Sequence, residues 1–480
     1  ELESLTGILA LLEWDQQTMM PPGGAHHRGA QLSTLSALHH EKLTDPRIEE
    51  WMQSLESSGP DPTQSAAIRN LRRDYNRARK VPVELVRACA RARSNGFVAW
   101  GAARESGAFS DFAPALRELV NLARQIASCL GEADHLYDNL LEAFDPGSTT
   151  AELRPLFSRL SSELSQFVAA CAQETGPEVL HLQISKTAQM RLNNRVVKSL
   201  GFRSEDGRLD RSIHPFTVGL GPHDVRLTTR VHELDPLSTL GGTIHECGHG
   251  LYEQGLPIEL AGTGLCAAAG MGLHESQSRF WENIIGRSQP FCIWLHQLFK
   301  DEWPGLEITP EGLYRASNRV EPSLVRVEAD EATYNLHIVI RFQLELALIE
   351  DSLQVDDLSE AWADAYADVL QLRPGNPVEG VLQDVHWASG LFGYFPSYTI
   401  GNLYSASFRQ QMEADIPAMW DQVEQGEFGE ILNWLRTHVH SKGHTQDAPQ
   451  IFKAAVGDRD SVSDLMSHLR SRAGEIYGIA

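Results

Sequence analysis

The sequence is organised around one segment, Thr243-Ile244-His245-Glu246-Cys247-Gly248-His249-Gly250. Asp235 and Pro236 precede it, and this pair is typical of a helix start, because an Asp side chain caps the first turn and a proline there loses no hydrogen bond. Apolar residues recur every three or four positions between 237 and 252, which predicts one buried helix face. The segment is therefore predicted to lie on a helix from Pro236 to about Gly255.

This helix would place His245 and His249 one turn apart on the same face. Two imidazole nitrogens in this arrangement can hold one Zn²⁺, and Glu246 can reach a water on the metal without binding the metal itself. The alternative is that both histidines are ordinary helix residues without a ligand. The His-Glu-x-x-His pattern alone does not decide between the two.

A catalytic zinc site needs a third protein ligand and keeps a fourth position open for water. Residues 273–281 open a second predicted helix after a glycine-rich turn, and Glu275 on it can supply that ligand. We prefer Glu275 to the competing His274, because two histidines and one carboxylate leave the zinc electrophilic while Glu246 handles protons. Arg279 could pair with Glu275 on an ordinary solvated helix, or bond the carboxylate oxygen that the metal leaves free.

Six short motifs are spread along the chain in a fixed order. They are residues 214–216 (His-Pro-Phe), 224–228 (Asp-Val-Arg-Leu-Thr), 245–249 (His-Glu-Cys-Gly-His), 274–278 (His-Glu-Ser-Gln-Ser), 325–330 (Val-Arg-Val-Glu-Ala-Asp) and 380–387 (Gly-Val-Leu-Gln-Asp-Val-His-Trp). With these motifs the chain resembles the metallocarboxypeptidases of the carboxypeptidase Taq family, which a thermostable Thermus enzyme typifies. Weaker similarity at residues 14–31 and 392–404 extends the likeness over nearly the whole chain.

The resemblance implies a carboxypeptidase of broad specificity that removes single residues from peptides with a free C-terminus. It also implies a helical fold of two lobes around a deep groove and a cytoplasmic homodimer. Each subunit would hold one Zn²⁺, with Co²⁺ as an alternative metal. Among the motif residues, His214 is expected to contribute to substrate binding.

Composition argues against several classes of partner. The net charge of −23 disfavours nucleic acid and anionic membrane surfaces, since both attract basic patches. We find no apolar run long enough to cross a membrane and no charged-then-apolar signal peptide at the amino end. The six cysteines are scattered without a disulfide-like pattern, which favours reduced thiols and a cytoplasmic location.

Helices are predicted almost throughout the chain, with breaks at Pro- and Gly-rich positions such as residues 19–24, 145–147 and 374–377. The exceptions are residues 216–219 and 225–231, two β-rich runs joined by a Leu-Gly-Pro turn. These runs predict an antiparallel hairpin just before the metal helix. We therefore expect an all-α protein with one small antiparallel sheet beside the active site.

The chain is expected to form a single peptidase domain, residues 1–480. Its first lobe would cover about residues 1–175, which read as helices without a catalytic motif. The second lobe, about residues 176–480, would hold the metal site, the small sheet and further helices.

The predicted reaction is hydrolysis of a peptide bond by a water that the metal activates. Glu246 is the expected general base, which takes a proton from the water and passes it to the leaving amine. The developing oxyanion needs another donor, worth roughly 3 kcal/mol if preorganised. Tyr398 and His386 are the candidates, since they lie in the downstream motif-bearing loops. For each, the alternative is a buried side chain with an ordinary hydrogen bond.

A carboxypeptidase must also bind the C-terminal carboxylate, which a guanidinium does best through two parallel hydrogen bonds. Arg326 is our candidate for this contact, and Arg226 is expected to close the end of the groove or to add a second contact. The alternatives are ion pairs, Arg326 with Asp330 and Arg226 with Asp224. Three acidic residues are expected to support the ligand histidines by hydrogen bonds: Asp330, Glu331 and Asp384.

Two other functions would use parts of the same sequence. A helical zinc oligopeptidase or dipeptidase would share the whole His-Glu-x-x-His and Glu275 site, so only the arginine motifs favour the carboxypeptidase. A binding protein with a structural zinc site would have four protein ligands, often cysteines. The only cysteine at ligand spacing is Cys247, which points away from the metal on helical geometry. Metal content, and hydrolysis after addition of a chelator, separate this last function from the first two.

Overall fold

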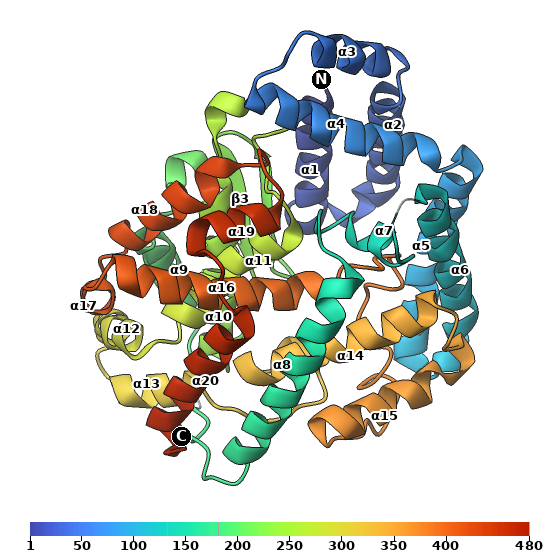
Figure 1. The fold of residues 1–480 in the computed structure, drawn as a ribbon. Helices are drawn as coiled ribbons and strands as arrows, with labels where there is room; N and C mark the ends of the chain where they lie inside the picture. The colour runs from blue at the N-terminus through green and yellow to red at the C-terminus, as the bar shows by residue number, and fades with distance from the viewer. Residues whose placement is uncertain (132, 181, 480) are drawn as a thin grey trace.

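The structure is a computed structural model that describes residues 1–131, 133–180 and 182–479. The protein is mainly helical, as predicted (Figure 1). The helices of the first part of the chain are α1 (Leu2–Thr18), α2 (Ala25–Leu43), α3 (Arg47–Ser57), α4 (Pro62–Lys80), α5 (Val83–Ser106), α6 (Ala113–Leu130), α7 (Asp138–Leu141), α8 (Thr150–Cys171) and α9 (Lys186–Ser199). The later ones are α10 (Pro236–Glu253), α11 (Met271–Arg279), α12 (Gln289–Glu302), α13 (Pro310–Ser317), α14 (Glu331–Ile349), α15 (Leu358–Leu370), α16 (Pro396–Asp415), α17 (Met419–Gln425), α18 (Gly429–His438), α19 (Ala448–Val456) and α20 (Ser461–Tyr477).

A small three-stranded sheet precedes α10. Strands β2 (Thr217–Gly221) and β3 (Asp224–Thr229) form the predicted antiparallel hairpin, with Thr217 opposite Leu227. The sheet as a whole is mixed rather than antiparallel, because β1 (Gly207–Arg211) pairs with β3 in parallel on its other side. The sequence analysis missed β1, since Gly-Arg-Leu-Asp-Arg has a single apolar residue and no strand-like alternation.

Helix α10 starts as predicted. The Asp235 side chain accepts a hydrogen bond from the backbone N–H of Ser238 at 3.0 Å, and Pro236 occupies the first turn. The helix ends at Glu253, two residues before the predicted stop at Gly255. Cys247 on this helix is fully buried in the hydrophobic core.

Two large hydrophobic clusters make up most of the core. One gathers side chains mainly from α5, α6, α8, α14, α15 and α20, and the other mainly from α9, α10, α12 and α17 to α19. Helix α16 crosses the centre of the molecule and contributes to both (Figure 1). The first cluster joins helices from both sides of residue 175, and the division into two lobes stays a prediction.

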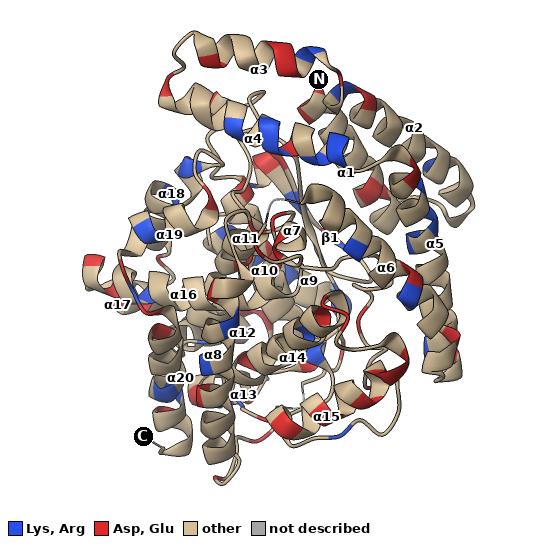
Figure 2. Cartoon of the chain, turned by 45° about the vertical axis from the view of Figure 1, so that its right-hand side comes forward, with Lys and Arg blue, Asp and Glu red and all other residues tan. Residues whose placement is uncertain are grey.

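Acidic and basic residues are interspersed along the helices (Figure 2). Of the helices that the structure describes, none is long and apolar enough to cross a membrane. All six cysteines are free, and four of them are buried.

Candidate active site

Helices α10 and α11 cross at close range, and this crossing assembles the candidate metal site. A Cβ atom at Gly248 would lie 2.6 Å from both the carbonyl oxygen of Gln277 and Cα of Ser278, so the approach requires glycine. On another face of α11, a Cβ atom at Gly401 of α16 would lie 2.6 Å from Cγ of Glu275. Helix α11 is thus held between α10 and α16, which fixes Glu275 against α10.

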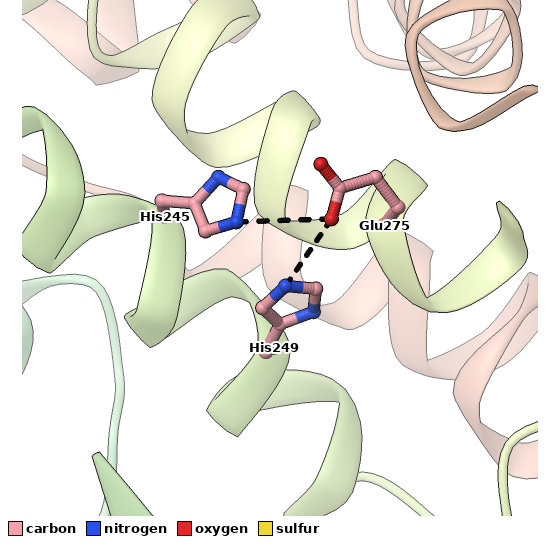
Figure 3. Close-up of side chains that lie close together, drawn as sticks. All are labelled: His245, His249 and Glu275. Atoms are coloured by element: carbon pink, nitrogen blue, oxygen red, sulfur yellow. Dashed lines mark ion pairs between the residues drawn. The ribbon is translucent and has the colours of Figure 1, made fainter. Parts of the chain in front are cut away.

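His245, His249 and Glu275 point toward one another (Figure 3). Oε2 of Glu275 lies 3.7 Å from Nε2 of His245 and 3.4 Å from Nε2 of His249. The three candidate ligand atoms all lie within 4.8 Å of one another. Two ligand atoms of a tetrahedral site are about 3.4 Å apart when each is about 2.1 Å from a zinc ion. The spacing and the donor types therefore fit a divalent metal such as zinc.

The second nitrogen of each histidine ring is already bonded. Nδ1 of His245 lies 2.9 Å from Oε2 of Glu282, and Nδ1 of His249 lies 3.1 Å from the backbone carbonyl of His274. Because both partners accept hydrogen bonds, each Nδ1 carries the proton and each Nε2 keeps its lone pair for a metal. Burial lowers the pKa of His249 to about 3, which also favours the neutral ring.

Glu275 directs its oxygen Oε2 at the histidines, and this oxygen also accepts a hydrogen bond from the Ser278 hydroxyl at 3.2 Å. Nε of Arg279 donates to Oε1 of Glu275 at 2.7 Å, which leaves Oε2 toward the rings. Burial alone would raise the pKa of Glu275, but the charge of Arg279 holds it well below its usual range. The carboxylate is therefore ionised, as a metal ligand must be.

His274, the competing third ligand, is directed elsewhere. Its Nε2 lies 2.9 Å from Oε1 of Glu253, and its ring stacks on the ring of His249 with 4.4 Å between centroids. The structure therefore brings Glu275, and not His274, together with the two histidines of α10.

Glu246 lies beside this cluster with a partner from the sheet. Its side chain is 7% exposed, and its Oε2 accepts a hydrogen bond from Oγ1 of Thr217 at 2.7 Å. Burial raises the pKa of Glu246, while His245 and the Thr217 hydroxyl oppose that rise. A carboxylate with a raised pKa is suited to accept a proton near neutral pH.

Tyr398 and His386 contact each other. The Tyr398 hydroxyl lies 3.0 Å from Nε2 of His386. Burial raises the pKa of Tyr398 well above its ordinary value, with the charge of Glu275 among the further causes, so the hydroxyl stays protonated. Burial lowers the pKa of His386 to about 3, so its ring is neutral.

Arg326 is buried and forms an ion pair with Asp384, not with Asp330 as the sequence allowed. It lies in a 3₁₀ turn, where its Nε donates to Oδ1 of Asp384 at 2.9 Å and one terminal nitrogen donates to the Tyr334 hydroxyl at 2.8 Å. Asp330 instead caps α14 by accepting from two backbone N–H groups. The guanidinium also lies 5.2 Å from the centroid of the Tyr398 ring.

Arg226 forms the alternative ion pair that the sequence allowed. Its Nε and one terminal nitrogen donate to the two oxygens of Asp224 at 2.9 and 3.0 Å. Its guanidinium also lies 4.2 Å from the centroid of the Trp14 ring of α1. His214, in the loop before β2, is exposed, and its backbone carbonyl accepts from the Ser212 hydroxyl.

The acidic residues that support the ligand histidines were predicted wrongly. Asp330 caps α14, Glu331 pairs with His468 and Arg472, and Asp384 pairs with two arginines. Glu282, which bonds His245, was overlooked, although an unbroken α-helix would place it, seven residues after Glu275, on the same face. In the structure Glu282 lies in the π-helical segment Phe280–Ile285 that follows α11. Thr217 was overlooked because nothing in a strand sequence indicates which helix residue it will touch.

Comparison with known proteins settles the class of this site. Residues 1–473 match the sequence model of the family described as carboxypeptidase Taq (M32) metallopeptidase. The chain belongs to this family. It is 40% identical to thermostable carboxypeptidase 1 of Thermus thermophilus, with 100% of this chain and 97% of the relative covered. It is 36% identical to carboxypeptidase 1 of Bacillus subtilis, with 98% of this chain and 95% of the relative covered.

A solved structure of an M32 carboxypeptidase from Deinococcus radiodurans has the same fold, with a TM-score of 0.97 and 36% identity. The superposition covers 100% of this chain and 98% of that one. The protein is therefore an M32 metallocarboxypeptidase, which acts on peptides and uses a divalent metal. The predicted family, the helical fold class and the enzyme class are confirmed.

Proposed function

We propose that this metallocarboxypeptidase holds one Zn²⁺ per chain through Nε2 of His245, Nε2 of His249 and Oε2 of Glu275. Two neutral imidazoles and one ionised carboxylate suit zinc and leave a coordination position open. Co²⁺ accepts the same donors and is expected to replace zinc with activity retained. The observation that carries this assignment is the convergence of these three atoms, while a hydrogen bond holds the other polar atom of each of the three side chains.

When bound, the ion polarises the scissile carbonyl and lowers the pKa of water toward about 7. Glu246 accepts the proton of the attacking water and delivers it to the leaving amine. The Tyr398 hydroxyl donates a hydrogen bond to the carbonyl oxygen of the substrate and keeps its proton. For this the Nε2–H of His386 must donate to the Tyr398 oxygen, which frees the hydroxyl proton. Nδ1 of His386 is then an unprotonated acceptor; it is buried and has no hydrogen-bond partner in the part of the chain that the structure describes.

We assign the C-terminal carboxylate of the substrate to the neighbourhood of Arg326. The guanidinium of Arg326 lies 5.2 Å from the centroid of the Tyr398 ring. Because Tyr398 is proposed to bond the reacting carbonyl, a carboxylate bound at Arg326 would belong to the residue next to that carbonyl. Arg226 lies on strand β3 and His214 in the loop before β2, and both are proposed to contact the substrate from the side of the sheet. Their positions beside the Thr217 strand support this assignment.

We further propose a homodimer in the cytoplasm, with neither nucleic acid nor membrane as a partner. Six unpaired cysteines suit a reducing compartment, and the charge of −23 repels anionic polymers and surfaces. Light scattering at several protein concentrations tests the dimer; a constant monomer mass would contradict it.

The direct test uses one short peptide with a free C-terminus and its C-terminally amidated twin, with products followed by mass spectrometry. Stepwise loss of single residues from the free form alone is the expected result. Internal cleavage of both forms would instead support the alternative function, a helical oligopeptidase with the same metal site. Cleavage of neither form with Zn²⁺ or Co²⁺ added would contradict both.

A further inference from the structure

Strand β2 carries one side chain that touches the proposed general base. Oγ1 of Thr217 lies 2.7 Å from Oε2 of Glu246 and 2.9 Å from the backbone carbonyl oxygen of the same residue. A hydroxyl has one proton, so it donates to one of these acceptors at a time. The carboxylate is the closer and the charged acceptor, and charge-assisted hydrogen bonds are the stronger ones.

The strand register directs the Thr217 side chain toward helix α10. Thr217 pairs with Leu227 of β3, and β2 runs along α10, so that Gly219, two residues on, faces Glu253. Alternate residues of a strand point to the same side. The hydroxyl of Thr217 is therefore fixed toward α10 by the strand register, and its branched side chain has few rotamers to choose from.

The contact also fixes which oxygen of Glu246 is left for chemistry. With Oε2 engaged, Oε1 is left without a donor among the residues that the structure describes, while 7% of the residue surface stays exposed. Without the hydroxyl, the carboxylate could rotate about its terminal torsion, which is broad for Glu. Small misplacements of a reacting group cost large factors in rate.

We infer that Thr217 is a positioning residue, which orients the Glu246 carboxylate for proton transfer through its side-chain hydroxyl. This inference rests on the proposed role of Glu246 as the general base. It differs from a purely structural role, in which Thr217 would only tie β2 to the backbone of α10 through the Glu246 carbonyl.

The first test compares Thr217→Val, which keeps the shape and loses the hydroxyl, with Thr217→Ser, which keeps the hydroxyl. For a short peptide with a free C-terminus, T217V is expected to lower kcat by about 10- to 100-fold with little change in KM. Metal content should be unchanged, and T217S should recover most of the loss. The matched control is Thr229→Val: Thr229 bonds Thr243 of α10 at 2.8 Å from the same sheet but does not touch Glu246. T229V should retain kcat.

The second test is a double-mutant cycle with Glu246→Asp, whose shorter side chain cannot reach Thr217. Adding T217V to E246D should then lower kcat no further. If Thr217 had only a structural role, T217V would lower kcat by the same factor in the wild-type protein and in E246D. Wild-type kcat in T217V, or equal losses in T217V and T217S, would overturn the inference. If T217V does not fold, Thr217→Ala takes its place. Glu246→Gln distinguishes failure of the Thr217 inference from failure of the proposed general base. Turnover in E246Q would refute Glu246 as the general base. An inactive E246Q together with wild-type kcat in T217V would refute only the role of Thr217.

Discussion

Two buried charged regions, one around Glu275 and one around Asp384, pair their charges in opposite ways. In the metal region, Glu275 bonds Arg279 with one oxygen and turns the other toward two neutral histidine nitrogens. In the arginine region, Asp384 uses both oxygens, accepting from Arg326 at 2.9 Å and from Arg341 at 2.6 Å.

The two regions differ in the polar atoms that remain available for a ligand. The metal region leaves acceptor atoms that face one point, and this arrangement suits a cation. The arginine region sets two guanidiniums against one carboxylate, and one buried terminal nitrogen of Arg341 has no hydrogen-bond partner among the described residues. That surplus of positive charge suits an anion, such as the C-terminal carboxylate assigned to Arg326. The predictions below test this difference.

The largest effect is expected at Glu246. Glu246→Gln removes the proton acceptor but keeps the shape of the side chain, so kcat should fall by about 10³-fold or more. Metal content should stay at the wild-type level, because Glu246 is not one of the three residues that could hold the metal. Steady-state kinetics with metal analysis of the same preparation checks this. Turnover near the wild-type rate would remove Glu246 from the mechanism.

A large loss of stability is expected when Asp384 is neutralised. Asp384→Asn leaves Arg326 and Arg341 buried with their charges uncompensated, which should cost about 3–5 kcal/mol in the free energy of unfolding. The matched control is Asp224→Asn, whose partner Arg226 belongs to a half-exposed pair; that change should cost under about 1 kcal/mol. Urea unfolding of the three proteins measures both. Equal costs would show that the arginine region is not the buried, surplus-charge cluster described above.

A smaller effect is expected at the support of the metal ligands. Glu282→Gln weakens the hydrogen bond that orients His245, and metal affinity should fall by about 10- to 100-fold. Glu253→Gln is the control, since Glu253 bonds His274 and no ligand ring. Competition with a chelator of known affinity gives both values. An unchanged affinity in E282Q would contradict the role of this bond.

The smallest expected effect concerns pH. Glu345 of α14 is fully buried and accepts from Tyr137, Trp387 and the Gly393 amide. Burial raises its pKa to about 7, with those three donors opposing the rise. Between about pH 4.5 and 7 the native state therefore binds a proton that the unfolded state has lost. Stability should fall there as pH rises, by at most about 1.4 kcal/mol per pH unit.

Glu345→Gln cannot titrate, so its unfolding free energy should lack this slope when the two proteins are compared across the same pH range. Parallel curves for the two proteins would show that Glu345 is ionised throughout, with the three donors outweighing burial.

The facing pair of histidines could be predicted because its information is local, whereas Glu275 comes from a separate helix. His245, Glu246 and His249 are related by helix geometry alone, and the helix start at Asp235 is equally local. The arginine region could not be predicted in this way. The pairing of Arg326 with Asp384 joins residues 58 positions apart, and a motif shows neither the partner nor the burial of its arginine. Thr217 and strand β1 were missed for the same reason, since both depend on contacts made across the fold.

The most direct test of the metal site is anomalous diffraction at the zinc edge from crystals of the zinc-loaded protein. One peak is expected, about 2.0–2.2 Å from Nε2 of His245, Nε2 of His249 and Oε2 of Glu275. A peak coordinated by His274, or one elsewhere in the molecule with this cluster empty, would contradict the account.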